Sequence, residues 1–490
     1  MNEPISKAQL FASLPSPWPT DLQVAIRKAA GALAAKLVVL DDDPTGTQTV
    51  YDVPVLTSWG VEELATELAD AAPCFYVLTN SRSLPPERAR DLARHLACNL
   101  RSAAVRSGRR FVLVSRSDST LRGHYPLETD VLAEELGPFD ATVLVPYFEA
   151  GGRYTIHDTH YVADGDTLIP AAATAFAHDA AFGYRSSNLR DWIAEKTGGA
   201  IPAKAVVSIS IDEIRSRGPG AIAARLERLP PGSTVIVNAA CPGDLDVFMF
   251  AALQAEAAGR RFLFRTAAQF VASRLGLMEQ ARWRPTFDGT APAQANGGLV
   301  VVGSYVPKSS HQLAELLRVA ATGTEATLLP VELSVPRVLA PAQREAEIGR
   351  VRTLMSDTLA AGRDVVLFTS RALVTGDDGA LGLEVGAKIS TALVELVHSL
   401  RKRPAFLVAK GGITSSDLAT RALGVRRAMV LGQIVPGVPV WRLGPESRFP
   451  GMPYIVFPGN VGDLHALADV YGRMGRSATM PQPSLSLTNP

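Results

Sequence analysis

A short apolar run that ends in three consecutive acids constrains this chain more than any other stretch. Residues 37–40 (Leu-Val-Val-Leu) are too few for a buried helix and rich in valine, which predicts a central strand covered on both faces. Asp41, Asp42 and Asp43 follow, and Pro44 starts a turn. Adjacent carboxylates repel one another, so a fold keeps them together when a metal ion, an arginine or a lysine compensates them. We therefore place a functional site here, in preference to a solvated acidic turn.

The composition narrows the class of protein. The chain has 490 residues, 47% of them hydrophobic and 20% charged, which is typical of a globular protein with two to three domains. A net charge of +1 provides no field for nucleic acid or an anionic membrane surface. The three cysteines show no metal-ligand spacing, and no apolar run approaches the roughly 18 residues of a membrane span. We expect a cytoplasmic enzyme or binding protein.

Strands alternate with helices along both halves of the chain. In the first half we expect helices at 21–35, 61–72, 86–105 and 248–259, and strands at 37–40, 74–78, 111–114, 142–145, 234–237 and 262–264. In the second half we expect a helix at 311–321 and strands at 299–302, 365–368, 406–409, 428–431 and 454–457. This alternation predicts an α/β fold with two α/β domains, each a mainly parallel sheet flanked by helices, and an active site in the cleft between them. The expected boundaries are an N-terminal domain at 1–280, a linker at 281–297, a C-terminal domain at 298–475 and a disordered tail at 476–490.

Polar clusters follow several strands of the first half. The carboxyl ends of parallel strands share one edge of a sheet, so these clusters should converge with the three acids. Their arginines are forked donors suited to a carboxylate or phosphate, and their acids and hydroxyls suit a polyhydroxylated carbon chain. Thr45, Thr47, Gln48 and Thr49 should add further polar groups. The candidate residues in the clusters are Arg82, Arg116, Asp118, Arg122 and Arg153.

Two histidines three residues apart, His157 and His160, are a weak candidate for a metal site. The residues around them favour extended structure over a helix, so we interpret the pair as a structural or substrate-lining loop and assign no metal ligands.

Three glycine-bearing turns follow strands of the second half. Gly411-Gly412 precedes a probable helix, Gly459 lies in a similar turn, and Gly303-Ser304 ends a third strand. Glycines let the backbone approach an anion, and a helix start directs unpaired N–H groups at it. Neither a P-loop nor a G-x-G-x-x-G fingerprint is present. Three such turns in one domain favour a nucleotide.

Five motifs together resemble the four-carbon acid sugar kinase family, in the same order and across both halves. They are Asp41-Asp-Asp-Pro-Thr-Gly-Thr-Gln-Thr49, Asp118-Ser-Thr-Leu-Arg-Gly123, Gly151-Gly-Arg-Tyr-Thr155, Lys410-Gly-Gly-Ile-Thr-Ser-Ser-Asp417 and Pro458-Gly-Asn-Val-Gly-Asp463. The resemblance implies a sugar-acid-binding domain and a nucleotide-binding domain, with ATP phosphorylating the terminal hydroxyl of a tetronate or 3-oxo-tetronate. It implies ATP contacts from Ser304, Gly411, Gly412, Ile413, Thr414 and Gly459, and substrate contacts from Asp42, Arg82, Asp118 and Arg122.

Two departures leave the substrate open. Ile413 stands where the 3-oxo-tetronate branch has an acid, and His124-Tyr125 follows the Asp118 motif, so the branched acid 3-oxo-isoapionate is a further candidate. Phosphoryl transfer needs a held acceptor, a cradled triphosphate with Mg²⁺ and a base. We expect Arg82 and Arg122 to bind the substrate carboxylate, Asp42 or Asp43 to accept the hydroxyl proton, and another of these acids to help hold Mg²⁺.

Two other functions fit parts of the sequence. The spacing of Asp41, Asp43, Thr45 and Thr47 also resembles the first motif of haloacid-dehalogenase-like phosphatases, in which Asp41 would be the nucleophile. A non-catalytic sugar-acid-binding protein would use the arginines but would not need the glycine turns. A homo-oligomer is compatible with the sequence, which does not specify the oligomeric state.

Overall fold

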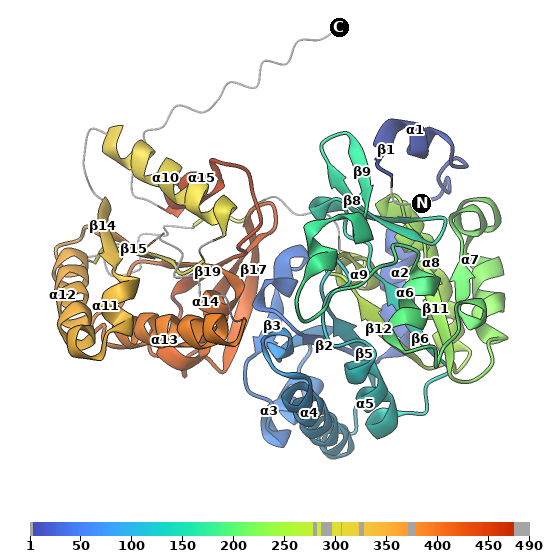
Figure 1. Ribbon diagram of the computed structural model, residues 1–490. Coiled ribbons are helices and arrows are strands. Elements are labelled where there is room, and N and C mark those ends of the chain that lie inside the picture. Colours follow the sequence, from blue (N-terminus) through green and yellow to red (C-terminus); the bar gives the residue numbers. More distant parts are fainter. Residues whose placement is uncertain are drawn as a thin grey trace, which may run out of the picture.

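A computed structural model of the chain describes residues 3–277, 282–285, 296–304, 306–322, 328–370 and 379–474. Within these residues the strands form one 15-stranded sheet and one 4-stranded sheet. Helices cover both faces of the large sheet, and its two halves lie side by side (Figure 1). The prediction of an α/β fold with two α/β halves is confirmed.

The first half contributes eight parallel strands to the large sheet. Side chains alternate between the two faces, so Leu37 and Val39 point to one core while Val38 and Leu40 point to the other. In spatial order the strands are β10 (Val207–Ile209), β11 (Ser233–Val237), β6 (Ala141–Val145), β12 (Phe262–Thr266), β5 (Phe111–Arg116), β2 (Lys36–Asp41), β4 (Cys74–Leu78) and β3 (Val53–Leu56).

Two helical layers bury these faces. One layer packs against Val38 and Leu40 and consists of α3 (Val61–Ala69), α4 (Pro86–Ser107) and α5 (Leu127–Leu136). The opposite layer includes α2 (Gln23–Leu33), α7 (Ile211–Glu227), α8 (Pro242–Ala257) and α9 (Gln269–Arg274). Burial on both sides explains why the strand before the three acids is apolar at every position. It also leaves the strand ends as the place where polar groups can gather.

The second half contributes seven strands. In spatial order they are β17 (Arg427–Val435), β18 (Val438–Leu443), β19 (Pro453–Phe457), β16 (Leu407–Lys410), β13 (Leu299–Val302), β15 (Asp364–Thr369) and β14 (Leu328–Leu333). The last five are mutually parallel. Their faces are covered by α10 (Pro307–Thr322) and α15 (Ala466–Met474) on one side, and by α12 (Pro341–Ala360) and α13 (Gly379–His398) on the other. The remaining helices are α11 (Val335–Leu339) and α14 (Gly412–Asp417).

The two halves are joined by strand pairing, which the sequence analysis did not anticipate. β3 pairs antiparallel with β17, from Val53 opposite Val430 to Leu56 opposite Arg427. The 3₁₀ turn η1 (Pro44–Thr49), directly after the three acids, also packs against the second half, where Trp441 Nε1 donates to Thr47 Oγ1 at 3.0 Å. Thr47 is therefore an inter-half anchor and not an open polar group. The two separate sheets that the sequence predicts are in fact one continuous sheet.

The 4-stranded sheet covers part of the first half near the carboxyl ends of its strands. Its order is β1 (Ile5–Ser6), β9 (Thr167–Pro170), β8 (Thr159–Asp164) and β7 (Arg153–Ile156), all antiparallel. β7 and β8 form a hairpin whose turn residues, His157 and Asp158, both have positive φ. Helix α1 (Lys7–Ala12) directly follows β1 along the chain, and α6 (Leu189–Lys196) comes after β9. These elements place Arg153 near enough to Asp118 for the two charges to interact.

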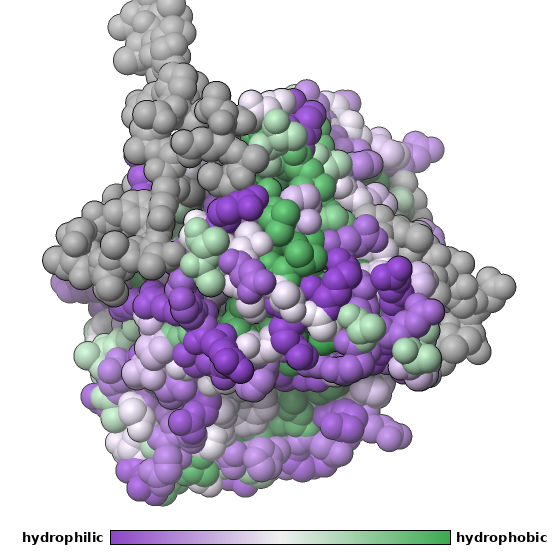
Figure 2. Space-filling view, turned by 90° about the vertical axis from the view of Figure 1, so that its left-hand side faces the viewer, coloured by the Kyte–Doolittle hydropathy of each residue, from purple (hydrophilic) through white to green (hydrophobic). Residues whose placement is uncertain are grey.

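Several expectations concern residues outside the described part of the chain. Most of the predicted linker at 281–297 and all of the predicted tail at 476–490 lie outside the described residues. Within the described residues, no helix is both long enough and apolar enough to cross a membrane. On the face seen in Figure 2, hydrophilic side chains surround smaller hydrophobic areas.

We predict that the Thr47–Trp441 hydrogen bond stabilises the junction of the halves. Thr47→Val and Trp441→Phe each remove one partner of a buried bond, and the pair should show a coupling free energy of about 1 kcal/mol in a double-mutant cycle of unfolding. Additive effects of the two substitutions would contradict this role.

Candidate active site

The three acids at the end of β2 occupy different environments. Asp41 and Asp42 are almost completely buried, whereas Asp43 is partly exposed. Asp43 begins η1, where its Oδ1 accepts hydrogen bonds from Thr45 N at 2.9 Å and Thr45 Oγ1 at 2.5 Å. Its Oδ2 therefore remains the oxygen directed away from the turn. Asp43 is the most accessible carboxylate of the three.

Arg82 lies at the centre of the acidic cluster. It comes from the 3₁₀ turn η2 (Ser81–Ser83), after β4, and it donates to Asp42 through Nη2 at 2.5 Å and Nε at 3.2 Å. Its Nη1 is 3.7 Å from Asp43 Oδ2 and 3.8 Å from Asp118 Oδ1. The guanidinium thus compensates three carboxylates that come from the ends of two strands.

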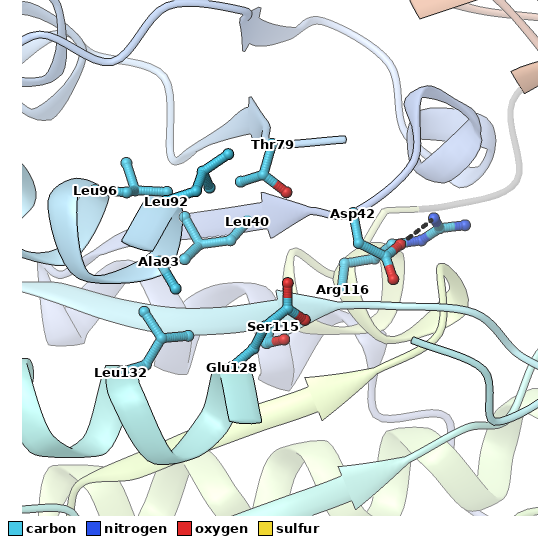
Figure 3. A pocket seen from close by; sticks show the side chains of 10 residues that line it. All are labelled: Leu40, Asp42, Thr79, Leu92, Ala93, Leu96, Ser115, Arg116, Glu128 and Leu132. Atoms are coloured by element: carbon cyan, nitrogen blue, oxygen red, sulfur yellow. Dashed lines mark ion pairs between the residues drawn. The ribbon is translucent and has the colours of Figure 1, made fainter. Parts of the chain in front are cut away.

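Arg116 compensates the acids from the other side. Its Nη1 donates to Asp41 Oδ1 at 3.0 Å and lies 3.8 Å from Asp42 Oδ1. Figure 3 shows Asp42 and Arg116 meeting at the ends of β2 and β5, and the cavity beside them has a volume of only about 10 Å³. That is room for about one water, not for a substrate. A cavity of about 490 Å³ lies at the opposite, amino ends of these strands, around Leu37 and Val112, away from the acids.

These environments shift the pKa values of Asp41, Asp42 and Asp118 in different directions. Burial raises the pKa of Asp41 to about 7, against the opposing attraction of Arg116. Burial also acts on Asp42, but the charge and hydrogen bonds of Arg82, with Arg116 and Ser117, outweigh it and lower its pKa. The pKa of Asp118 is likewise held well below its usual range because Arg82 and Arg122 outweigh its burial. Asp42 and Asp118 are therefore carboxylates that form ion pairs with arginines, Asp42 with Arg82 and Asp118 with Arg122.

A second group of arginines surrounds Phe176. Arg122 Nε donates to Asp118 at 2.7 Å, and the guanidinium carbons of Arg122 and Arg153 lie 5.1 and 5.5 Å from the Phe176 ring centre. Arg153 forms no ion pair within the described residues, its buried Nε has no partner there, and burial lowers its pKa. A guanidinium in this state is suited to an anionic ligand.

The predicted convergence of the polar clusters is confirmed in geometry, but further residues hold it together. Ser117 Oγ donates to Asp42 Oδ2 at 2.6 Å and accepts from Arg265 Nη2 at 2.9 Å. Arg265 also lies 3.5 Å from Glu128, which accepts a hydrogen bond from Ser81. Sequence reasoning missed Arg265 and Glu128, although Arg265 lies near the end of β12 and could have been included on the shared-edge rule.

His157 and His160 lie in different surroundings. His160 is fully buried, donates from Nε2 to Ser119 O at 2.7 Å, and has a pKa lowered to about 4 by burial. His157 lies at the hairpin turn, with Nδ1 4.0 Å from Asp212. In the described part of the chain, no three or more His, Cys, Asp or Glu side chains are arranged to hold a metal ion.

The three glycine turns of the second half meet at one place. Gly411 has φ +118°, and a Cβ there would lie 3.0 Å from Ser304 Cβ. A Cβ on Gly303 would lie 2.3 Å from Thr414 Oγ1, and one on Gly459 would lie 3.2 Å from Ser304 Oγ. Ile413, in the same turn, is 59% exposed. The structure therefore brings Ser304, Gly411, Gly412, Ile413, Thr414 and Gly459 into one neighbourhood.

The first-half acids reach this neighbourhood. A Cβ built on Gly412 would lie 2.9 Å from Asp43 Oδ2, so the Asp43 carboxylate lies directly against the Gly412 backbone at the start of α14. The first N–H groups of a helix have no partner within the helix, and the close glycine backbone forms a cradle that a side chain would fill. These features fit a nucleotide phosphate group. The carboxylate of Asp43 is also placed to supply an oxygen ligand to an accompanying divalent cation.

Comparisons with known proteins agree with this division of the chain. A model of the sugar-binding N-terminal domain matches residues 37–274, and a model of the nucleotide-binding C-terminal domain matches residues 299–467. No curated protein matches the chain.

Solved structures share the fold. A protein of Salmonella typhimurium LT2, solved under the provisional name of a tRNA synthase, is 17% identical, with a TM-score of 0.65 over 90% of this chain and 99% of that one. HI1011 of Haemophilus influenzae, assigned to DUF1537, is also 17% identical, with a TM-score of 0.59 over 89% and 99%. At this identity the similarity establishes the architecture alone.

The raised pKa of Asp41 predicts a pH-dependent cost in stability. Between about pH 4, where an unfolded aspartate ionises, and about pH 7, where Asp41 ionises, the folded state holds a proton that the unfolded state has lost. Asp41 therefore lowers stability as the pH rises through this window. Asp41→Asn should gain in unfolding temperature relative to wild type from pH 5 to pH 8.

Asp42→Asn is the matched control, because the pKa of Asp42 is lowered. Its carboxylate stabilises the fold above the pKa of an unfolded aspartate, so this variant should lose stability at both pH values. A pH-independent difference between wild type and Asp41→Asn would contradict the assignment.

Proposed function

Because the chain belongs to the four-carbon acid sugar kinase family, we propose that it transfers the terminal phosphoryl group of ATP to the terminal hydroxyl of a small sugar acid. The candidate acceptors are a tetronate, a 3-oxo-tetronate and the branched 3-oxo-isoapionate. One observation carries the proposal: Asp43 of the sugar-binding half lies against Gly412 of the nucleotide-binding half. An acceptor held by the first half and a phosphate held by the second would meet there.

The acceptor's carboxylate is best assigned to Arg122 and Arg153. Arg82 was expected to bind it, but its donors are engaged by Asp42 and faced by Asp43 and Asp118. Arg153 has no carboxylate partner in the described residues, and its buried Nε has no hydrogen-bond partner there. Arg122 pairs with Asp118 and lies 3.6 Å from Asp179, but its partly exposed guanidinium lies with that of Arg153 around Phe176. The hydroxylated chain would then extend from these arginines toward Asp43, with Arg82 and Asp118 along its path.

The proton of the reacting hydroxyl is best accepted by Asp43. Asp42 is bound on both oxygens, by Arg82 and by Ser117, and its lowered pKa makes it a poor base. Asp43 keeps Oδ2 directed at the glycine turn. ATP, held by Ser304, the turn at Gly411–Thr414 and Gly459, would supply the phosphoryl group, and Mg²⁺ bound with the nucleotide would neutralise the charge of its phosphates.

The alternative functions are less well supported. A phosphatase nucleophile must reach its substrate, yet Asp41 is 1% exposed and bound to Arg116. A non-catalytic sugar-acid-binding protein would leave the nucleotide-binding half without a role. A coupled ADP-release screen over erythronate, threonate, their 3-oxo forms and 3-oxo-isoapionate tests the proposal. Turnover of one acid supports it, and phosphate-ester hydrolysis without ATP would overturn it.

We predict that Asp43→Asn lowers kcat about 10²–10⁴-fold while the KM for the sugar acid changes little, because the base is lost but the arginines remain. Steady-state kinetics with the best acid of the screen measures this. Asp91→Asn, on the exposed surface of α4, is the matched control. An unchanged kcat for Asp43→Asn would remove Asp43 from this role, and a raised Mg²⁺ requirement with restored rate at high Mg²⁺ would make it a metal ligand instead.

Arg153→Gln should have the opposite kinetic signature. It removes a charge that binds the acceptor equally before and during the reaction, so we expect KM to rise about 10–100-fold with a smaller change in kcat. A variant with wild-type KM would show that the carboxylate binds elsewhere.

A further inference from the structure

Lys410, the last residue of β16, is a buried cation that the proposed reaction does not use. Its side chain is fully buried. Nζ donates to Pro458 O at 2.8 Å and to Gly459 O at 3.3 Å, and it lies 3.9 Å from the centre of the Phe457 ring. It forms no ion pair with any described carboxylate. Burial, with a smaller contribution from Lys308, lowers its pKa to about 7.

A buried charge without a counter-ion is costly, and folds normally compensate it with an opposite charge. Two carbonyl dipoles and an aromatic face compensate Lys410 only in part. Near neutral pH the Lys410 side chain is therefore only partly ionised, because the described side chains supply no negative charge that would hold its proton. This suggests that the missing negative charge is provided by a ligand.

The position of Lys410 indicates which ligand. Gly411 follows it directly, Gly459 accepts a hydrogen bond from its side chain, and Ser304 N donates to its backbone carbonyl at 3.3 Å. Ser309 Oγ ties the same groups together, at 3.0 Å from Ser304 Oγ and 3.1 Å from Gly459 O. All three glycine-bearing turns of the second half, at Gly303–Ser304, Gly411–Gly412 and Gly459, therefore surround this one lysine.

We propose that Lys410 is a positioning residue that stabilises the nucleotide's phosphate groups from beneath these turns, so that its contribution to affinity grows with the number of phosphate charges. The inference rests on the proposed function, since it takes ATP as the nucleotide. The side chain holds the Pro458–Gly459 carbonyls in place and acts on the phosphates through its charge, not through contact. A charge in this buried setting is weakly screened by salt, so it acts over the length of a triphosphate.

Two neutral variants separate the charge from the bracing hydrogen bonds. Lys410→Gln can still donate to the Pro458 and Gly459 carbonyls, whereas Lys410→Met cannot. Both remove an uncompensated buried charge, so neither is expected to lower the unfolding temperature through charge loss. Should Met disrupt the fold, Gln still tests the charge.

Lys36→Met is the matched control. Lys36 is also buried, and its Nζ also donates to two backbone carbonyls, those of Asp70 and Ala72, but it lies at the start of β2, away from the glycine turns. A general effect of losing a buried lysine would appear in this variant as well.

The test is the affinity of the full-length protein for adenosine, AMP, ADP and ATP, measured by calorimetry in metal-free buffer. For Lys410→Gln we expect affinity for ATP to fall about 10–100-fold, for ADP and AMP by progressively less, and for adenosine by less than about threefold. Lys36→Met should leave the series unchanged. An equal loss for all four ligands, or wild-type affinity for ATP, would overturn the role of the charge.

The outcome for wild type separates this inference from the proposed function. If wild type binds ATP no better than adenosine and releases no ADP with any sugar acid, the kinase proposal fails. If wild type is an active kinase and the Lys410 variants lose the same affinity for adenosine, AMP, ADP and ATP, only the role of Lys410 fails.

Discussion

The antiparallel pairing of β3 with β17 determines how the two halves of this protein face each other. Three successive antiparallel pairings, β3–β17, β17–β18 and β18–β19, separate the two parallel regions, so the carboxyl ends of these regions would point to opposite edges of a flat sheet. Sheets are not flat: the path β2-β4-β3-β17-β18-β19-β16 has six steps, and roughly 20–25° per step turns the strands by roughly 120–150°. The twist offsets most of the reversal. Asp43 after β2 and Gly412 after β16 can therefore meet.

The same pairing limits how the halves can move. Two domains linked by a flexible chain would be free to separate, but here they share backbone hydrogen bonds and the buried Thr47–Trp441 bond. Arg427, at the start of β17, also pairs with Glu67 of α3 at 2.5 Å. Any closure around substrates must then bend or twist a continuous sheet. Small adjustments about the junction are more compatible with this structure than wide opening.

Much of the site was predictable because parallel strands share an edge. That rule places Asp42, Arg82 and Asp118 together from their positions after β2, β4 and β5, and the structure agrees. The rule does not reveal which partner each acid selects. The pairing of Asp42 with Arg82 and Ser117, the direction of Asp43 Oδ2 toward Gly412, and the lack of a described carboxylate partner for Arg153 depend on side-chain directions that no sequence spacing encodes.

The junction was not predictable for a different reason. β3 is four residues long and contains Pro54, which argues against a central strand, and its partner β17 lies more than 300 residues away. Thr47 appeared to be one more polar group for a substrate, but its partner, Trp441, gave no signal in the sequence. In the sequence Lys410 is only the first residue of a glycine-bearing motif. The contacts of its buried Nζ with Pro458 O and the Phe457 ring depend on a second loop that lies next to it only in the fold.

The central claim is that acceptor and nucleotide meet between Asp43 and the Gly411–Gly412 turn. A crystal structure with a non-hydrolysable ATP analogue and the sugar acid tests it most directly. We expect the terminal phosphate at the start of α14 and the acceptor hydroxyl within about 2.6–3.2 Å of Asp43, or one water away. A terminal phosphate bound on a surface that Asp43 does not face would contradict it.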